Sequence, residues 1–299
     1  MNHLKITQSE LALLCGVSQG TVDRALNGRG EISEATKERI LATAKKYGFR
    51  ASKGNSKPER TKTIGLVFFD LNNEFFSRLI TDIEKKAAEK GFLISVMFTH
   101  YSEENEIKCI RQLYSSGIDA IFLCSVQQNE QFVTFLNQLS IPIVALGNRI
   151  EGIPYVGADD FNAMAYLTEK VIATHKKIIY YSPALRYENA FAQHKRYEGF
   201  LSAINNVPFE TVKDPENLKE RYEEGTAIIC STDLYAIYAY THSFADGFYG
   251  FDNIPSLDRL KLPISSIEIS TEEIAEKAIK MVEENSRDDT FIPHSLIER

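Results

Sequence analysis

The 299-residue sequence predicts a small all-α part over residues 1–49 and a two-lobed, doubly wound α/β part over residues 63–299. Three observations predict this fold class. The first 49 residues carry apolar side chains at helical spacing around glycine-containing turns. From residue 63, short apolar runs alternate with amphipathic stretches, which is typical of parallel βαβ units. The alternation occurs twice in series, which indicates two similar lobes.

The amino-terminal part begins with two short helices joined by a tight turn. Thr7 is the candidate N-cap of the first helix, and Gly16 can end it with a positive φ. Ser18 can cap the second helix. The positions expected to give each helix one buried side are Leu11, Leu14 and Cys15, then Val22 and Leu26. A glycine-containing turn before a polar-faced second helix is typical of a helix-turn-helix, whose second helix enters the major groove of DNA.

A third helix is expected to follow, with Ser33 as its N-cap and Gly48 at its end. Its packing residues are expected to be Ile40, Leu41, Ala44 and Tyr47. Residues 16–28 read Gly-Val-Ser-x-x-Thr-Val-x-Arg-x-Leu-Asn-Gly. With the third helix, this order resembles the head of the LacI/GalR family of bacterial transcription regulators. The resemblance implies that residues 1–49 are a helix-turn-helix DNA-binding domain; the plain alternative is a helical hairpin.

The second helix carries the side chains best suited to reading DNA. Arg24 can donate two hydrogen bonds to guanine, and Gln19 can pair with adenine. The resemblance places both at specificity positions together with Gly20, which has no side chain to contribute. Asp23 stands where many relatives have Ser. We expect its carboxylate to accept a hydrogen bond from a cytosine amino group or to orient a neighbouring base. The residues suited to phosphate or backbone contact are Thr7, Ser18, Thr21, Asn27 and Arg29. For each polar residue the alternative is a solvated helix face.

Charge is divided along the chain. The formal net charge is −7, yet residues 1–60 hold 11 Lys and Arg against 6 Asp and Glu. This segment, with a net charge of +5, can neutralise phosphates, whereas the remainder carries −12 and should be repelled by DNA.

Residues 50–62 form a polar, basic linker with Gly54, Pro58 and no large apolar residue. Relatives commonly carry a Pro-Asn-x-x-Ala-Arg-x-Leu hinge whose leucines wedge into the minor groove. This chain has no leucine there, so we expect a flexible electrostatic arm.

Composition excludes several classes. The four cysteines form no C-x-x-C pair, and reduced, buried thiols are expected. We expect a cytoplasmic protein, because we find no signal peptide and no run near the roughly 18 apolar residues of a membrane span. No nucleotide-binding loop, G-x-S-x-G sequence or metal-spaced His/Cys set argues for an enzyme, and no catalytic residue, metal or cofactor is expected. The basic head argues against a transport component.

The α/β part follows element by element. The first series has expected strands 64–69, 92–98, 120–124 and 141–146, with helices 74–90, 103–116 and 129–139. The second series has expected helices 161–173, 189–205, 215–224 and 232–242, with strands 177–182, 209–212, 227–230 and 247–251. Strand 264–269, helix 271–284 and strand 290–297 close the chain.

The family's effector-binding part resembles a periplasmic sugar-binding protein, whose chain crosses between two lobes three times. We therefore expect a near lobe, towards the DNA, over residues 63–158 and 264–288. The far lobe is expected over residues 159–262 and 289–299.

Open α/β sheets bind ligands at the carboxyl ends of their strands. Two segments there resemble the family: Val-Gly-Ala-Asp-Asp at 156–160, and Arg-Tyr-Glu-Gly-Phe at 196–200, whose Arg clamps the ligand in relatives. The expected ligand-binding residues are Asp70, Asn73, Phe75, Phe76, Asn148, Asp159, Arg196, Asp233 and Asp252. Carboxylates with one Arg suit polyhydroxyl ligands. The alternatives are loop carboxylates, helix N-caps and, for the phenylalanines, core packing.

These observations favour a homodimeric transcription regulator, most simply a repressor. It would bind an inverted-repeat operator in double-stranded DNA and be gated by a small polar effector such as a sugar. The segments 200–227 and 233–252 are shorter than in relatives. The alternative is therefore a regulator whose trimmed far lobe no longer binds a ligand and acts as a dimer or protein-interaction platform.

Overall fold

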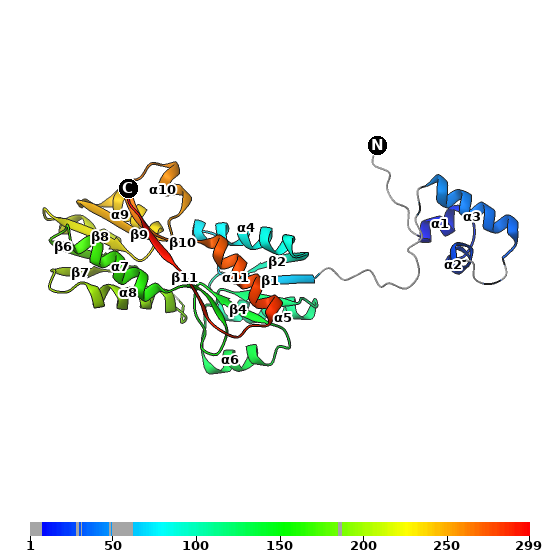
Figure 1. Ribbon diagram of the computed structural model, residues 1–299, viewed down its shortest axis with the longest axis horizontal. Helices are drawn as coiled ribbons and strands as arrows, with labels where there is room; N and C mark the ends of the chain where they lie inside the picture. Colours follow the sequence, from blue (N-terminus) through cyan, green and yellow to red (C-terminus); the bar gives the residue numbers. More distant parts are fainter. Residues whose placement is uncertain (1–7, 28–29, 31, 48, 50–61, 185–186) are drawn as a thin grey trace. The chain divides into compact units, whose positions relative to one another are not determined.

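The computed structural model describes residues 8–27, 30, 32–47, 49, 62–184 and 187–299. The chain divides into two compact units, Met1–Arg60 and Thr61–Arg299 (Figure 1). The expected linker over residues 50–62 lies outside the described residues except for Lys62, which begins the first strand.

The described part of the first unit forms helices α1 (Gln8–Leu14), α2 (Gln19–Asn27) and α3 (Glu34–Lys46). Gly16 has a φ of +61°, and the Val17 N–H donates to the Ala12 carbonyl at 3.1 Å, so the chain turns sharply after α1. The core residues are Leu11, Ala12, Cys15, Val22, Ala25, Ile40 and Ala44. The expected core positions Leu14, Leu41 and Tyr47 are instead 50%, 43% and 41% exposed. A core of this size is filled by one face of each helix, the face that carries Leu11 on α1, Val22 on α2 and Ile40 on α3.

The near lobe is built on a six-stranded sheet in the order β11-β5-β4-β3-β1-β2, and its pairings are parallel. Its strands are β1 (Lys62–Phe68), β2 (Phe92–Phe98), β3 (Ala120–Leu123), β4 (Ile143–Leu146), β5 (Tyr155–Ala158) and β11 (Thr290–Ile292). Its helices are α4 (Glu74–Glu89), α5 (Glu103–Ser115), α6 (Glu130–Asn137) and α11 (Thr271–Glu284). Apolar residues at helical spacing, such as Leu79 and Ile83 of α4, are buried against the sheet.

The far lobe has a second six-stranded sheet, in the order β12-β10-β9-β8-β6-β7, in which only β12 runs antiparallel to its neighbour. Its strands are β6 (Lys177–Tyr181), β7 (Phe209–Val212), β8 (Thr226–Cys230), β9 (Gly247–Phe251), β10 (Ile264–Ile269) and β12 (His294–Ile297). Its helices are α7 (Asp160–Ile172), α8 (Phe191–Ala203), the 3₁₀ helix η1 (Pro215–Arg221), α9 (Asp233–His242) and α10 (Pro255–Arg259).

The sheet topology corrects two expected lobe assignments. Strand β10 was expected in the near lobe, but it pairs with β9 in the far sheet, so the chain crosses after it. Residues 290–297 were expected to form one strand of the far lobe, but β11 pairs with β5 in the near sheet. Pro293 lies between β11 and β12 and has no N–H to donate, which is consistent with a break in the strand where the chain crosses again.

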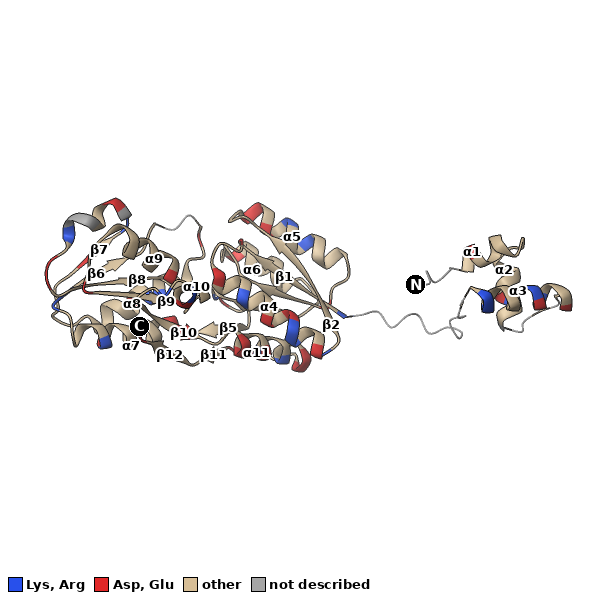
Figure 2. Cartoon of the chain, turned by 90° about the horizontal axis from the view of Figure 1, so that it is seen from above, with Lys and Arg blue, Asp and Glu red and all other residues tan. Residues whose placement is uncertain are grey.

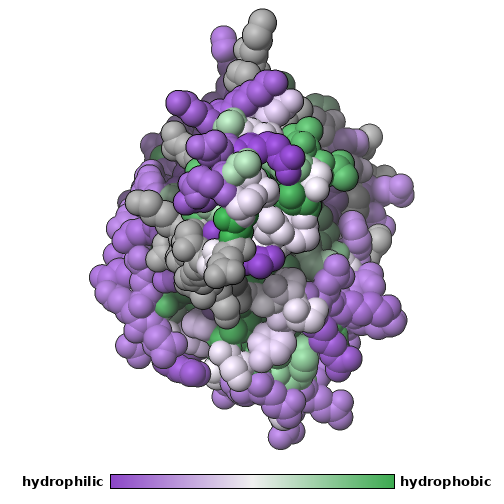
Figure 3. Space-filling model, turned by 90° about the vertical axis from the view of Figure 1, so that its right-hand side faces the viewer, coloured by the Kyte–Doolittle hydropathy of each residue, from purple (hydrophilic) through white to green (hydrophobic). Residues whose placement is uncertain are grey.

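Charged residues are frequent on helices such as α4, α5 and α11 (Figure 2), whereas strands β3, β4, β8 and β9 contain no Lys, Arg, Asp or Glu. This distribution is expected of parallel strands covered on both faces. Hydrophobic side chains also reach the surface among polar ones (Figure 3). The four cysteines are free and buried, as expected. In the described part of the chain, no helix is both long enough and apolar enough to cross a membrane.

Candidate functional site

Helix α2 of the first unit presents a polar surface opposite its buried side. Val22 and Ala25 are buried, whereas Gln19, Asp23 and Arg24 are exposed. The Arg24 Nε donates to the Gly20 carbonyl at 3.1 Å, and the Gln19 Nε2 donates to the Ser9 Oγ of α1. The exposed face therefore offers a forked donor and an amide, the two groups that suit guanine and adenine edges.

Of the other residues expected at DNA, Ser18 accepts from the Thr21 N–H at 3.2 Å and thereby caps α2. Gly20 is exposed, and a Cβ placed there would meet only the Ser18 Oγ, at 3.9 Å. Thr7, Arg29 and the side chain of Asn27 lie outside the described residues.

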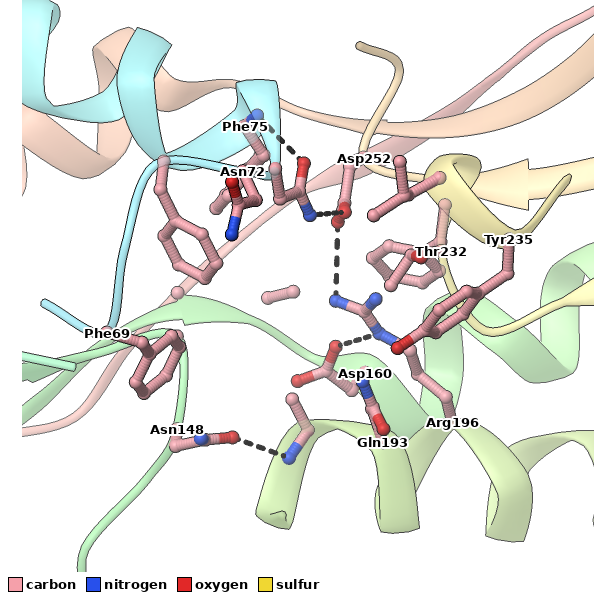
Figure 4. Close-up of a pocket in the computed structure, with 18 of the residues that line it drawn as sticks. Phe69, Asn72, Phe75, Asn148, Asp160, Gln193, Arg196, Thr232, Tyr235 and Asp252 are labelled. Atoms are coloured by element: carbon pink, nitrogen blue, oxygen red, sulfur yellow. Dashed lines mark hydrogen bonds and ion pairs between the residues drawn. The ribbon is translucent and has the colours of Figure 1, made fainter. Parts of the chain in front are cut away.

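A cavity of about 670 Å³ lies between the near and far lobes of the second unit. This volume is within the range of about 300–1,000 Å³ typical of small-molecule sites. Six of the expected residues line it: Asn73, Phe75, Phe76, Asn148, Arg196 and Asp252. They come from the start of α4, from the segments after β4 and β9 and from α8, as Figure 4 shows for four of them.

Arg196 is the centre of the polar network in the cavity. Its Nε donates to the Asp160 Oδ1 at 2.8 Å and its Nη1 to the Ser231 carbonyl at 2.7 Å. Its Nη2 lies 3.5 Å from the Asp252 Oδ1, and its guanidinium lies 3.6 Å from the centre of the Phe251 ring. These contacts fix the plane of the guanidinium (Figure 4).

Asp160 was not among the expected ligand-binding residues, yet it lines the cavity. Burial outweighs the nearby Arg196 guanidinium and raises the pKa of the Asp160 carboxyl to about 6. Its Oδ2 is buried and has no hydrogen-bond partner among the described residues. Figure 4 shows this second oxygen turned away from Arg196.

Several hydrogen bonds join the lobes around the cavity. Asn73 caps α4 by accepting from the Phe75 N–H at 3.0 Å, and its Nδ2 donates to the Asp252 Oδ2 at 2.9 Å. Glu74, the first residue of α4, accepts from the Ser256 N–H at 3.0 Å. These contacts hold the start of α4 against the far lobe.

A second set of contacts involves the loop between β6 and α8. The Asn189 N–H donates to the Val126 carbonyl at 2.9 Å, and the Ala192 N–H donates to the Asn148 Oδ1 at 3.2 Å. The Val126 N–H in turn donates to Glu106, where burial raises the carboxyl pKa to about 7. The two lobes are therefore bridged on more than one side of the cavity.

Three expected ligand-binding carboxylates are absent from the described cavity lining, and each has an internal partner. Asp70 accepts from the Asn72 N–H at 2.9 Å in the loop after β1. Asp159 is the N-cap of α7 and accepts from the Asn162 N–H at 3.1 Å. Asp233 is buried and accepts from the Ser266 Oγ at 2.6 Å and the Ile254 N–H at 2.8 Å. The placement of Asp70 and Asp159 corresponds to the alternative of loop carboxylates and caps, whereas Asp233 is the buried first residue of α9 and bonds to residues outside its own helix.

An aromatic group on the cavity wall was also missed from the sequence. The rings of Phe69, Tyr101 and Tyr187 lie 5.3–5.6 Å apart between centroids, and the planes of Tyr101 and Tyr187 differ by 28°. Tyr101 has a φ of +61°, a conformation that bulky residues rarely adopt. Because Tyr187 comes from the far lobe and the other two from the near lobe, no local sequence pattern could have grouped them.

Within the described residues, no group of three or more His, Cys, Asp and Glu is arranged to hold a metal ion. The polar groups of the cavity lining are two carboxylates, one guanidinium, side-chain amides, hydroxyls and the His100 imidazole.

Comparison with known families identifies both units. The profile described as "Bacterial regulatory proteins, lacI family" matches residues 7–52. The profile described as "Periplasmic binding proteins and sugar binding domain of LacI family" matches residues 61–254. The second match alone covers more than half of the chain.

The named relatives are regulators. The fructose operon regulatory protein of Vibrio cholerae is 27% identical over 207 residues, which are 67% of this chain and 63% of that protein. The chain thus spans less than two thirds of that relative. The regulator AscG of Escherichia coli is 27% identical, with 87% of this chain and 88% of AscG covered. The Cra dual regulator of Pseudomonas putida, solved with fructose 1-phosphate, shares the fold with a TM-score of 0.68 at 17% identity, over 80% of this chain and 99% of that one.

Proposed function

The chain belongs to the LacI family of bacterial regulatory proteins, and we propose on that premise that it is a sequence-specific, DNA-binding transcription regulator. The observation that carries the proposal is the exposed polar face of α2, with Gln19 and Arg24, in a unit that matches the family's regulatory profile. An exposed Arg–Gln pair on the second helix of a helix-turn-helix is suited to base edges in the major groove.

The proposal extends to the second unit as an effector-binding domain. A cavity of about 670 Å³ with a buried guanidinium and carboxylates supports binding of a small polar ligand such as a sugar. Asn73, Phe75, Phe76, Asn148, Arg196 and Asp252 are the proposed ligand residues, with Asp160 added. The alternative, a platform that binds no ligand, gives no reason for a cavity of this size lined by a buried guanidinium and two buried carboxylates.

We further infer that the protein is a cytoplasmic homodimer. We infer that this dimer binds inverted-repeat operator DNA and represses transcription there. A symmetric dimer presents two identical heads, and two identical heads require two half-sites of opposite direction. The net charge of +5 on residues 1–60 supplies the non-specific attraction to phosphate.

The test is selection of binding sites from random duplex DNA with the purified chain, compared with an Arg24→Ala variant. Wild type should select an inverted repeat, and Arg24→Ala should lose about 1–3 kcal/mol of affinity and blur one base pair in each half-site. Arg39→Ala is the matched control, because Arg39 is also exposed but lies on α3. It should keep the selected motif. Failure to enrich any sequence, or an unchanged motif and affinity in Arg24→Ala, would contradict the proposal.

A further inference from the structure

The side chain of Arg24 is held along α2 by the backbone of its own helix. Arg24 lies in the last turn of α2 and is exposed. Its Nε donates to the Gly20 carbonyl, one turn earlier, at 3.1 Å. Because that bond occupies the Nε donor, a contact with a base that uses two donors has to come from the terminal nitrogens Nη1 and Nη2.

A residue outside α2 lies against the same side chain. Helix α2 ends at Asn27, and Gly30 follows with a φ of +78°. A Cβ built at Gly30 would lie 3.2 Å from the Arg24 Cδ and 3.9 Å from the Arg24 Cγ. Carbon atoms in contact ordinarily lie about 3.5–4.0 Å apart. A side chain at position 30 would therefore displace the Arg24 stem, which is the chain of carbons from Cβ to Cδ.

The two contacts act on different parts of Arg24. The Gly20 carbonyl binds the Nε, and Gly30 lies beside the Cγ and the Cδ. An exposed Arg side chain ordinarily samples many rotamers and loses that freedom when it binds. The Arg24 stem is restricted before DNA is present, so it has less freedom to lose.

A restricted stem favours one base over the others. Guanine presents two acceptors in the major groove, O6 and N7, whereas adenine presents one acceptor beside a donor and thymine presents one acceptor beside a methyl group. A stem that moves freely lets the guanidinium adjust to a single acceptor on any of these bases. A fork whose position is preset meets a matching pair of acceptors only at guanine.

The positive φ of Gly30 gives a second reason for glycine at this position, because bulky residues rarely adopt it. Gly16 provides a comparison within the same unit. Its φ is +61°, and a Cβ built there would meet no described atom within 4 Å. A substitution at Gly16 therefore encounters backbone strain alone, whereas one at Gly30 encounters backbone strain and the Arg24 stem.

Building on the proposed DNA-binding function, we propose that Gly30 is a positioning residue for base recognition. The lack of a side chain at position 30 keeps the Arg24 stem against α2, so that Nη1 and Nη2 approach one guanine of each half-site as a preset pair of donors. Gly30 contributes to specificity in this way without a base contact of its own.

Operator binding by the full chain tests the proposal. The probes are the operator that wild type selects and the same operator with adenine in place of the guanine at the base pair that Arg24→Ala blurs. Gly30→Ala and Gly30→Asn should each narrow the affinity ratio between the two operators about fivefold or more and leave the other motif positions unchanged. Asn adopts a positive φ more readily than Ala, so a change in both variants reports the Cβ and not the strain. A wild-type ratio in either variant would overturn the proposal.

A double-mutant cycle tests whether Gly30 acts through Arg24. The loss of affinity for the selected operator that Gly30→Ala causes should be about threefold smaller or less in an Arg24→Ala background, since the stem is then absent. An equal loss in both backgrounds would show that Gly30 acts through the backbone, and the proposal would be wrong.

Gly16→Ala is the matched control for strain. It should lower the thermal stability of the chain and keep the guanine preference, because its methyl group does not reach Arg24. Circular dichroism confirms that each variant is folded. If Gly16→Ala lost the guanine preference as well, strain anywhere in the first unit would explain the effect, and the role of Gly30 would be refuted.

Site selection by wild type separates this inference from the proposed function. A wild-type chain that selects no sequence loses the regulator function itself. A wild-type chain that selects an inverted repeat, with variants of Gly30 that keep the full guanine preference, remains a regulator, and only the role of Gly30 is wrong.

Discussion

Arg196 depends on partners that are far from it in sequence. Asp160 is 36 residues before it, and Asp252 follows it on a different strand end. A buried guanidinium is stable only with such partners, and buried carboxylates in turn need the cation. The Arg-x-x-Gly-Phe pattern thus belongs to a network and not to a single ligand contact.

We predict that Arg196→Ala destabilises the second unit by about 3–5 kcal/mol, because it leaves two buried carboxylates without their cation. The cost should increase with pH. In wild type the folded pKa of Asp160 is about 6 against an ordinary 3.8, so stability falls as pH rises between these values. Without Arg196 the folded pKa rises further, and the loss extends above pH 6.

Chemical denaturation of wild type and variant at pH 5 and pH 7.5 measures this effect. The difference in unfolding free energy should be larger at pH 7.5. Asp159→Asn, which removes a neighbouring carboxylate outside the network, should change neither value much. A difference that is equal at the two pH values would argue against the buried carboxylates as its cause.

Asp159 and Asp160 show why sequence placed the site only in part. Both follow β5, and either could face a ligand. Asp159 occupies the N-cap and turns to its own helix, whereas Asp160, one position on, faces Arg196. Asp233 was expected for its strand-end position but is bound by Ser266 and the Ile254 N–H, which are distant in sequence. The residue types of the site and their place at strand ends could be predicted from the sequence. Which of two adjacent carboxylates faces the cavity depends on partners from other elements, and this could not be predicted.

At the scale of elements, the contact between α7 and α8 positions the network. A Cβ built at Gly199 would lie 2.2 Å from the Phe161 carbonyl oxygen and 3.0 Å from its carbon. The glycine of the Arg-x-x-Gly-Phe pattern therefore allows two helix backbones to approach closely. Because Gly199 is three residues after Arg196, this approach also sets the position of the guanidinium.

We predict that Gly199→Ala destabilises the second unit by about 1–3 kcal/mol or more, because backbone atoms must move to admit the methyl group. It should also weaken effector binding through displacement of Arg196. Thermal unfolding and ligand titration measure both effects. Ser202→Ala, at an exposed position on the same helix, should stay within about 0.5 kcal/mol of wild type. A fully stable Gly199→Ala variant would show that the helices are not in close contact.

Most elements followed from periodicity, because strands such as β3 and β4 are continuous apolar runs and helices such as α4 have one apolar face. Strand β5 and helix α10 were not expected, since Tyr155–Ala158 and Pro255–Arg259 are too short to show a period. Lobe membership of β10 and β11 could not be predicted either. The lobe to which a strand belongs depends on which distant strand it pairs with. The local sequence of an apolar strand does not differ between the two sheets.

At the scale of the molecule, side-chain hydrogen bonds join the two lobes. Glu74 accepts from the Ser256 N–H across the lobes. Asn73 and Asp252 add a second link. These bonds lie beside the cavity and involve α4 of the near lobe, which follows residues 50–62 in the sequence. A ligand that changed these bonds could therefore change the position of the near lobe and, through residues 50–62, the position of the head.

The linker determines how such a change can reach DNA. Residues 50–62 carry five Lys and Arg, one Glu and no leucine, so the chain has no apolar wedge there to insert between base steps. Gly54 and Pro58 oppose a helix by about 1 and 3 kcal/mol.

We therefore predict that the operator stays nearly straight in the complex and that the linker adds salt-dependent affinity instead. Effector control would then act on the spacing of the two heads and not on folding of hinge helices. A circular-permutation assay, calibrated with phased A-tract fragments of known bend, measures the angle. A sharp bend at the operator centre would mean that these residues order on DNA despite their composition, and the control would then have to pass through a folded hinge.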